Sequence, residues 1–167
     1  KGIQQEKPLL LYGTTEHKAV TETLKHWNKM INIGGEVVAI PVDENGILDI
    51  DFIADKASDA IVICTMVANN ETGVYQDLAL LDQTIRAKNP DILWMVDCVQ
   101  ALGKIDLDIA NTTIDYAPFS GHKLYAPKGI GLLYIREGAP YTPFIAGGGQ
   151  ESGLRSGTEN LPGIAAL

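Results

Sequence analysis

Apolar runs separated by polar segments are the main pattern of this chain. Six runs are rich in β-branched and aromatic residues and have the length of buried strands. They cover residues 8–12, 36–42, 60–67, 92–97, 116–120 and 129–136. Two other segments repeat apolar residues at helical spacing: Val20, Leu24, Trp27 and Ile31 in the first, and Leu78, Leu81 and Ile85 in the second. Strands that alternate with helices predict an α/β fold, a mostly parallel sheet flanked by helices.

Turn residues mark the boundaries of these elements. Residues 43–46 (Asp-Glu-Asn-Gly) are a turn signal, and residues 89–91 (Asn-Pro-Asp) end the second helix before the next strand. After Arg136 the strand pattern stops, and glycine is frequent from 147 to 163. No repeat, low-complexity tract or linker interrupts the chain. We therefore predict one domain over 1–167, in which 137–167 is an extended glycine-rich segment.

Composition narrows the range of partners. The 167 residues are 46% hydrophobic, which is enough for a core, and 13 basic against 21 acidic residues give a net charge of -8. Without a Lys/Arg cluster, a nucleic-acid partner is not expected. No apolar run approaches the roughly 20 residues of a membrane span, and the polar start from Lys1 to Lys7 does not resemble a signal peptide. Cys64 and Cys98, in or beside strands, predict buried thiols in a reducing, cytoplasmic environment.

Two residues at predicted strand ends carry the first chemical signal. Asp97 ends the strand 92–97, and Lys123 follows the strand 116–120. Ligands of open α/β sheets bind at the carboxyl ends of the strands. A pyridoxal-phosphate site needs a lysine nucleophile and a carboxylate for the ring nitrogen, and these two residues could supply both. The alternatives are a surface lysine in a turn, and a capping box in which Asp97 and Gln100 only start a helix.

Four motifs then follow one another in a recognisable order. They are residues 15–20 (Thr-Glu-His-Lys-Ala-Val), 69–73 (Asn-Asn-Glu-Thr-Gly), 120–123 (Ser-Gly-His-Lys) and the glycine-rich run 147–160. In this order and spacing the chain resembles cysteine desulfurases of the NifS/IscS type, which are class V aminotransferases among the fold-type I pyridoxal-phosphate enzymes. The resemblance covers almost the whole chain. It implies the central part of that family's large, cofactor-binding domain.

The resemblance also implies an activity and residue roles. The complete enzyme would convert L-cysteine to alanine and pass the sulfur, as a persulfide, to an acceptor protein for iron–sulfur cluster or thio-cofactor assembly. Lys123 would bind pyridoxal 5'-phosphate covalently, and His17 would stack on its ring as a candidate acid/base. The remaining implied contacts are Asp97 at the ring nitrogen, Gln100 at the phenolic oxygen, Asn70 at that oxygen and the substrate carboxylate, Ser120 and His122 at the phosphate, and Thr158 at the phosphate of the neighbouring subunit of a homodimer.

Several of these residues also fit purely structural roles. His17 precedes Val20 by three residues and would fall on the apolar face of the first helix, while Asn70, Ser120 and His122 could simply belong to turns. Two other functions also remain open. One is a different class V pyridoxal-phosphate enzyme, such as a selenocysteine lyase or an aminotransferase. The other is a non-catalytic truncated homologue that serves as an interaction module.

Three parts of the family pattern have no counterpart here. We expect a phosphate-binding loop before Lys1, and a loop with the persulfide-forming cysteine and an arginine for the substrate carboxylate beyond Leu167. Neither Cys64 nor Cys98 lies in a comparable loop, so this fragment is expected to be inactive alone. The glycine-rich run from Gly147 to Thr158 has few side chains to cover a sheet. It is therefore expected not to fold back on its own subunit but to extend toward a partner chain.

Overall fold

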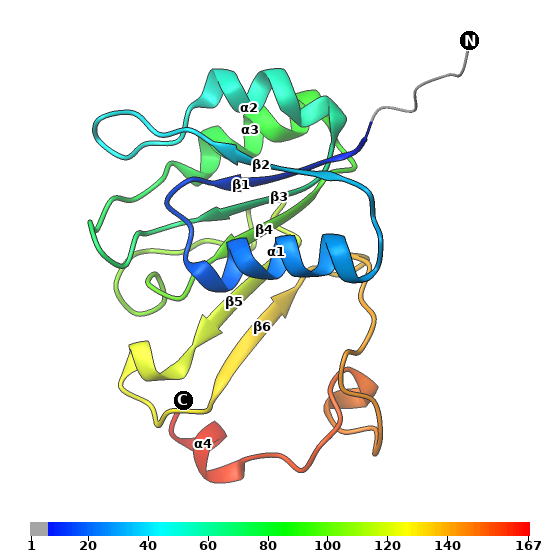
Figure 1. Ribbon diagram of the computed structural model, residues 1–167. Coiled ribbons are helices and arrows are strands. Elements are labelled where there is room, and N and C mark those ends of the chain that lie inside the picture. The colour runs from blue at the N-terminus through cyan, green and yellow to red at the C-terminus, as the bar shows by residue number, and fades with distance from the viewer. Residues whose placement is uncertain (1–6) are drawn as a thin grey trace.

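The computed structural model describes residues 7–167 and shows one six-stranded sheet (Figure 1). Residues 1–6, most of the polar start considered above, lie outside the described part. The strand order is β2-β1-β3-β4-β5-β6. The strands are β1 (Leu9–Gly13), β2 (Glu36–Ile40), β3 (Ala60–Met66), β4 (Leu93–Asp97), β5 (Tyr116–Ser120) and β6 (Gly131–Ile135). All neighbouring pairs are parallel except β5 and β6, which confirms the predicted α/β fold with a mostly parallel sheet.

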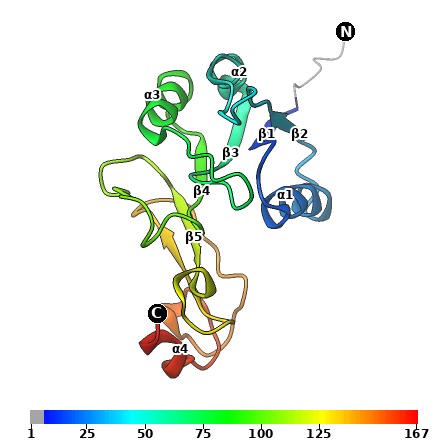
Figure 2. The ribbon, with the colours of Figure 1, turned by 90° about the vertical axis from the view of Figure 1, so that its left-hand side faces the viewer.

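Helices lie on both faces of the sheet. Helix α1 (Lys18–Met30) lies on one face, and α2 (Ile50–Lys56) and α3 (Leu78–Lys88) lie together on the other (Figure 2). A short helix, α4 (Leu161–Ala165), ends the chain below β6. Within residues 7–167, no helix combines the length and the apolar character that crossing a bilayer would require.

Helix α2, like α4, is not predicted by the hydrophobic pattern. It begins at Asp49, whose carboxylate accepts a hydrogen bond from the backbone amide of Phe52 at 2.9 Å. With seven residues it makes only two turns, and Ile53 is its one buried residue. Such a short helix leaves no repeating apolar spacing in the sequence, so only the N-terminal cap marks it.

The main core lies between the sheet and helices α2 and α3. Leu81 and Ile85 of α3 are buried, as the helical spacing predicts. Trp94 on β4 is fully buried, and its indole Nε1 donates a hydrogen bond to the hydroxyl of Thr65 on β3 at 3.0 Å. This bond satisfies both buried polar groups inside an apolar layer.

A buried carboxylate ties α3, β4 and β6 together. Asp115, just before β5, is 2% exposed and accepts hydrogen bonds from the amide of Trp94 and from the guanidinium groups of Arg86 and Arg136. Arg86 also donates to the hydroxyl and carbonyl of Thr113. Asp115 carries the negative charge that pairs with both arginines, so its removal would leave unpaired positive charges in a mostly buried place.

The structure corrects the prediction for the first helix. Val20 of α1 is buried, but Trp27 and Ile31, expected on the same apolar face, are 37% and 63% exposed. Helix α1 contacts β1 and β2, and Val20 is its one buried residue.

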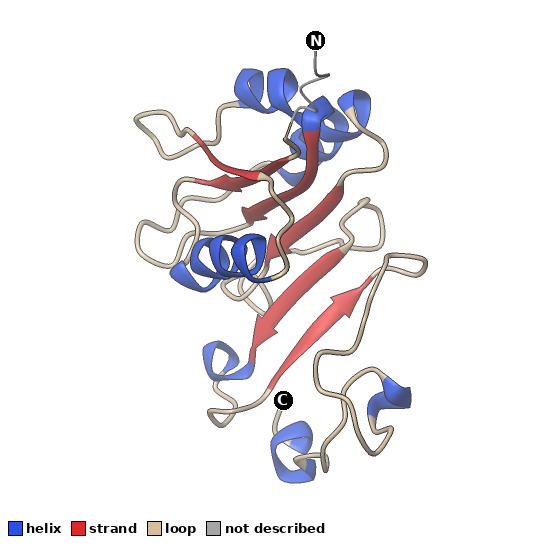
Figure 3. Cartoon of the chain, turned by 45° about the vertical axis from the view of Figure 1, so that its right-hand side comes forward, coloured by secondary structure: helices blue, strands red, loops and turns tan. Residues whose placement is uncertain are grey.

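Residues 137–167 run back beside β6 of the same chain (Figure 3). The hydroxyl of Tyr141 donates to the carbonyl of Leu154 at 2.9 Å, and the amide of Ser156 donates to the carbonyl of Ile145 at 2.9 Å. Most of the stretch 150–160 is exposed, with Ser156 as its buried member. The segment thus folds back along the edge strand of its own sheet, so the expectation that it does not contact its own subunit is wrong. Its position relative to a second chain remains a prediction.

Candidate active site

The carboxyl ends of the parallel strands meet at one cavity of about 540 Å³. Seven of the eight predicted site residues line it: His17, Asn70, Asp97, Gln100, Ser120, His122 and Lys123. They come from four places in the chain, after β1, β3, β4 and β5. Parallel strands all end at the same edge of a sheet, which is why such distant residues converge.

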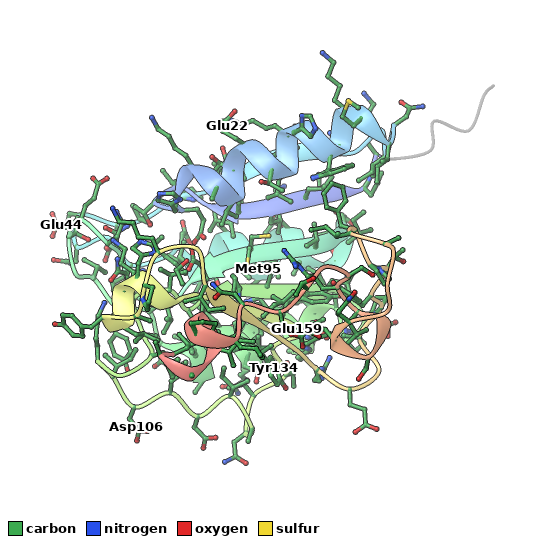
Figure 4. The ribbon with its side chains drawn as sticks, turned by 90° about the horizontal axis from the view of Figure 1, so that it is seen from below. Glu22, Glu44, Met95, Asp106, Tyr134 and Glu159 are labelled. Carbon is green, nitrogen blue, oxygen red and sulfur yellow. The ribbon has the colours of Figure 1, made fainter. Side chains whose placement is uncertain are left out.

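The remaining walls of the cavity are mostly apolar. Val20 and Leu24 of α1 face it on one side, and Met66 and Met95 form part of the sheet beneath. Figure 4 shows Met95 near the middle of the sheet, whereas Glu44 and Asp106 project from the outside of the molecule. The cavity therefore offers an apolar slot with polar groups gathered at one end, an arrangement suited to a flat ring with a charged substituent.

Lys123 lies in a turn that a close backbone approach makes possible. After β5, the turn Gly121–Leu124 begins at Gly121, whose amide donates to the carbonyl of Ile130 at 2.9 Å. A side chain at Gly121 would come within 2.8 Å of the Ile130 side chain and 2.9 Å of its carbonyl. Glycine is needed here because the chain passes against Ile130. As a result Ser120, His122 and Lys123 all reach the cavity, and Lys123 makes no salt bridge within residues 7–167.

Asp97 presents one free carboxylate oxygen. Its Oδ1 accepts the backbone amide of Val99 at 2.9 Å, which forms an Asx turn. Oδ2 accepts no hydrogen bond from the described residues. The capping-box alternative is wrong: no α-helix begins here, the residues after Asp97 form successive turns, and Gln100 instead accepts from Lys104 at 2.6 Å. The Asx turn still orients Asp97 and leaves Oδ2 for a ligand.

His17 is the N-terminal cap of α1 and does not lie on the apolar face of that helix. Its backbone is extended, and its Nδ1 accepts the amide of Ala19 at 3.1 Å. An acceptor Nδ1 places the ring proton on Nε2. The ring lines the cavity and is exposed. Capping therefore fixes the ring tautomer and leaves one nitrogen available for proton transfer.

The turn after β3 combines a structural and a site residue. Asn69 closes the turn, because its Oδ1 accepts the amides of Glu71 and Thr72 at 2.9 Å each. Its Nδ2 donates to the carbonyl of Thr15 at 3.0 Å and so links this turn to the loop after β1. Asn70 is exposed and lines the cavity. The turn interpretation therefore holds for Asn69, whereas the contact of Asn70 with a cofactor and a substrate remains a prediction.

Thr158 is the predicted site residue that lies elsewhere. It lines a separate hollow of about 600 Å³, between β6 and residues 150–160, and not the cavity of Lys123. Glu159, next to Thr158 in sequence, is visible beside this part of the chain in Figure 4. Thr158 therefore does not complete the site of its own chain, and its role toward a neighbouring subunit remains a prediction.

The two cysteines are buried, free thiols, as predicted. Cys64 lines the cavity but is 3% exposed, and burial raises its pKa far above the usual range of a thiol. Burial and the charge of Asp97 raise the pKa of Cys98 to about 12. Neither thiol ionises readily, so neither has the reactivity that sulfur transfer requires.

The sequence interpretation missed Glu16, which follows β1 and precedes His17. It is 8% exposed, although charged residues in a polar loop are normally solvated. Neither carboxylate oxygen has a hydrogen-bond partner within the described structure. No local signal in the sequence marks it, because the groups that enclose it come from later strands.

The comparisons with known proteins agree with this site. The family model of class-V aminotransferases matches residues 1–167. The chain belongs to the class-V aminotransferase family. It is 42% identical over 165 residues to cysteine desulfurase 2 of Trichormus variabilis and 38% identical over 170 residues to cysteine desulfurase IscS of Rickettsia africae. These alignments cover 98% and 100% of this chain, and the chain spans about 40% of the length of each relative.

Two solved structures are also similar to this class-V aminotransferase chain. A NifS-like protein superimposes with a TM-score of 0.89 at 41% identity, over 96% of this chain and 43% of the other. The structure of SspA in complex with cysteine has a TM-score of 0.83 at 33% identity, over 97% of this chain and 46% of the other. The family membership implies a pyridoxal-phosphate cofactor.

The residues of the cavity fit that cofactor. The free Oδ2 of Asp97 suits a protonated ring nitrogen, and the amine of Lys123 suits a covalent bond to an aldehyde. Ser120 and His122 supply donors near the N-terminus of the Gly121 turn, where a phosphate would be held. The fit rests on the combination of a carboxylate, an amine and hydrogen-bond donors in one cavity, and not on any one residue.

Proposed function

We propose that this chain carries the cofactor site of a pyridoxal-phosphate-dependent cysteine desulfurase. The observation that carries the proposal is the meeting of Asp97 and Lys123 in one cavity at the carboxyl ends of β4 and β5. The similarity to cysteine desulfurases supports the choice within the class-V family. No observation favours a selenocysteine lyase, an aminotransferase or a non-catalytic module over it.

The residues of the cavity have complementary tasks in this proposal. When bound, pyridoxal phosphate supplies an electron sink that weakens the bonds at the α-carbon of an amino acid. Lys123 would hold the cofactor covalently through its side-chain amine. Asp97 keeps the ring nitrogen protonated through a charge-assisted hydrogen bond. His17, whose ring proton is on Nε2, stacks on the ring and moves a proton at the substrate.

The remaining polar residues orient the cofactor and the substrate. Ser120 and His122 donate hydrogen bonds to the phosphate, and Gln100 and Asn70 reach the phenolic oxygen. Gln100 keeps its amide nitrogen free for this contact, because Lys104 occupies its oxygen. Asn70 also faces the substrate carboxylate. The apolar walls formed by Val20 and Met95 limit the access of water to the ring.

L-cysteine is the proposed substrate, and a thiol outside residues 7–167 is the proposed first acceptor of its sulfur. The cysteine complex of the similar SspA structure supports the substrate. The burial of Cys64 and Cys98 supports an external acceptor, because neither thiol is available as a thiolate. An acceptor protein for iron–sulfur cluster or thio-cofactor assembly would then receive the persulfide sulfur. Two free thiols are also in keeping with a reducing, cytoplasmic location.

A homodimer is the proposed assembly, with Thr158 donating to the phosphate of the neighbouring subunit. Thr158 is exposed and lies outside the cavity of its own chain. Leu132 and Leu133 of the edge strand β6 are 41% and 47% exposed, which favours a covering chain. Light scattering should give twice the 18.0 kDa of one chain. Leu133→Lys should shift the mass toward the monomer, whereas Ile61→Lys, at another exposed strand position, should not.

Reduction of the cofactor complex tests the site itself. Borohydride treatment after incubation with pyridoxal phosphate should attach the cofactor to the peptide that contains Lys123. Lys123→Arg should abolish the adduct, and the matched variant Lys128→Arg, in the same loop, should retain it. An adduct that maps mainly to another lysine would contradict the assignment.

A further inference from the structure

Glu16 is a buried acid that the proposed mechanism does not use. Its residue exposure is 8%, and neither carboxylate oxygen is hydrogen-bonded within the described structure. A buried polar group without a partner costs free energy, and an ionised one costs far more than a neutral one. An apolar side chain of the same size could be buried here without this cost, so the presence of an acid needs an explanation.

The local backbone holds Glu16 in this position. Its amide donates to the carbonyl of Gly13 at 2.9 Å, which closes the turn at the end of β1. A side chain at Gly13 would lie 3.2 Å from Oε1 of Glu16, so the carboxyl group packs against the glycine backbone. Asn69 closes the other side by donating to the carbonyl of Thr15. The acid is thus enclosed at the carboxyl edge of the sheet, between the loops that carry His17 and Asn70.

The groups that face this carboxyl come from two further strands. Asp97 at the end of β4 acts on it by charge, and Cys64 on β3 responds to the Glu16 charge in turn. The Gly13 and Leu48 side is uncharged. No lysine or arginine forms a salt bridge with Glu16 in the described part of the chain. His17, its neighbour in sequence, is turned toward its cap at Ala19.

Burial first, and the charge of Asp97 second, raise the pKa of Glu16 to about 8. The backbone amide of Met66, which does not reach hydrogen-bonding geometry with either oxygen, opposes this shift. Near neutral pH the Glu16 carboxyl is therefore largely protonated. A positive charge placed against Asp97 would cancel part of the repulsion and favour ionisation of Glu16.

We propose that Glu16 is a positioning acid coupled to Asp97, and that Glu16 holds a proton while Asp97 is unpaired and releases it when a cation binds Asp97. The cation is the protonated ring nitrogen of the cofactor, so this inference rests on the proposed function. The proton leaves the Glu16 carboxyl for solvent, and no bond other than O–H breaks. With the ring cation bound, the site would then contain two carboxylates near the positive charge. Without the ring cation, the proton on Glu16 prevents two negative charges from being close together in a buried place.

Carboxyl signals in carbon-13 NMR spectra of the chain, labelled at glutamate, test the coupling directly. Glu16→Gln identifies the signal by its loss, and Glu22→Gln, which removes an exposed carboxyl of α1, should leave it in place. In the wild-type chain the Glu16 midpoint should lie near pH 8. In Asp97→Asn it should fall by roughly one pH unit, because a nearby like charge is removed. A midpoint that is the same in both proteins would overturn the proposal.

Addition of pyridoxal phosphate provides the second arm. Where borohydride reduction shows the Lys123 adduct, the Glu16 midpoint should fall by a similar amount, and an unchanged midpoint in the loaded protein would refute the proton release. If no adduct forms at all, the proposed function fails. The Glu16–Asp97 coupling is then judged on the Asp97→Asn result, so the two failures are distinguishable.

Discussion

The indole of Trp27 on α1 packs edge-on against the ring of Phe144, with ring centroids 5.6 Å apart and planes at 81°. This contact connects the first helix to the segment 137–167, which follows the last strand. Sequence periodicity places Trp27 in the core beneath its own helix. In the structure it is 37% exposed and its aromatic partner belongs to the other end of the chain.

A double-mutant cycle of Trp27→Ala and Phe144→Ala should therefore show coupling. Edge-to-face aromatic pairs contribute about 0.5–1.5 kcal/mol beyond the area they bury, and unfolding in urea would measure it. Tyr125, which is fully exposed, is the control: a cycle of Trp27→Ala with Tyr125→Ala should give no coupling. A zero value for Phe144 as well would mean that the segment does not rest on α1 in solution.

Removing the charge of Asp115 should be strongly destabilising. Asp115→Asn leaves the guanidinium groups of Arg86 and Arg136 without their anion in a buried site, which typically costs about 3–5 kcal/mol. The same substitution at Asp55, which pairs with Lys56 at the surface, should cost less than about 1 kcal/mol. Denaturant unfolding of both variants gives the comparison, and similar losses would contradict the network.

The raised pKa of Glu16 makes stability depend on pH with a definite sign. The folded chain retains a proton up to about pH 8, whereas the unfolded chain releases it near 4.5. The folded state then binds more protons, so the free energy of unfolding should fall as pH rises between these values. The loss is on the order of 4 kcal/mol for a shift of this size.

Glu16→Gln should flatten this pH dependence, because the amide cannot ionise. The variant should be more stable than the wild-type chain above pH 8 and differ little from it near pH 5. Urea unfolding at several pH values would show this, with Glu22→Gln as the variant that keeps the slope. If the free energy of unfolding of the wild-type chain instead rose relative to that of Glu16→Gln between pH 5 and pH 8, the pKa of Glu16 would not be raised in the folded state.

The two cysteines should be unreactive in the folded chain. A thiol with a pKa of about 12, as for Cys98, is ionised at pH 8 in roughly one molecule in 10,000. Labelling with a disulfide reagent should be slow in the native protein and complete in denaturant. With added pyridoxal phosphate, the chain alone should release no sulfide from L-cysteine. Release that Cys64→Ser or Cys98→Ser abolishes would show that one of these thiols accepts sulfur.

The sequence alone determined the sheet and most of the cavity. All six strands are apolar runs in the sequence, and residues at or directly after the carboxyl ends of the parallel strands must share one edge of the sheet. That rule placed Asp97, Ser120 and Lys123 together before any coordinates. The glycine at position 121 and the asparagines at 69 and 70 also carry local signals, because their backbone roles depend on residue type.

Only the tertiary structure decided the environments that distant residues create. The sequence predicts Glu16 as a solvated loop residue, whereas the tertiary structure buries it close to Gly13, Asn69 and Asp97. The exposure of Trp27 depends on which elements pack around α1, and the separation of Thr158 from Lys123 depends on the path of residues 137–157 beside β6. Burial and electrostatic coupling are properties of neighbours in space, and a periodic pattern along the chain records only neighbours in sequence.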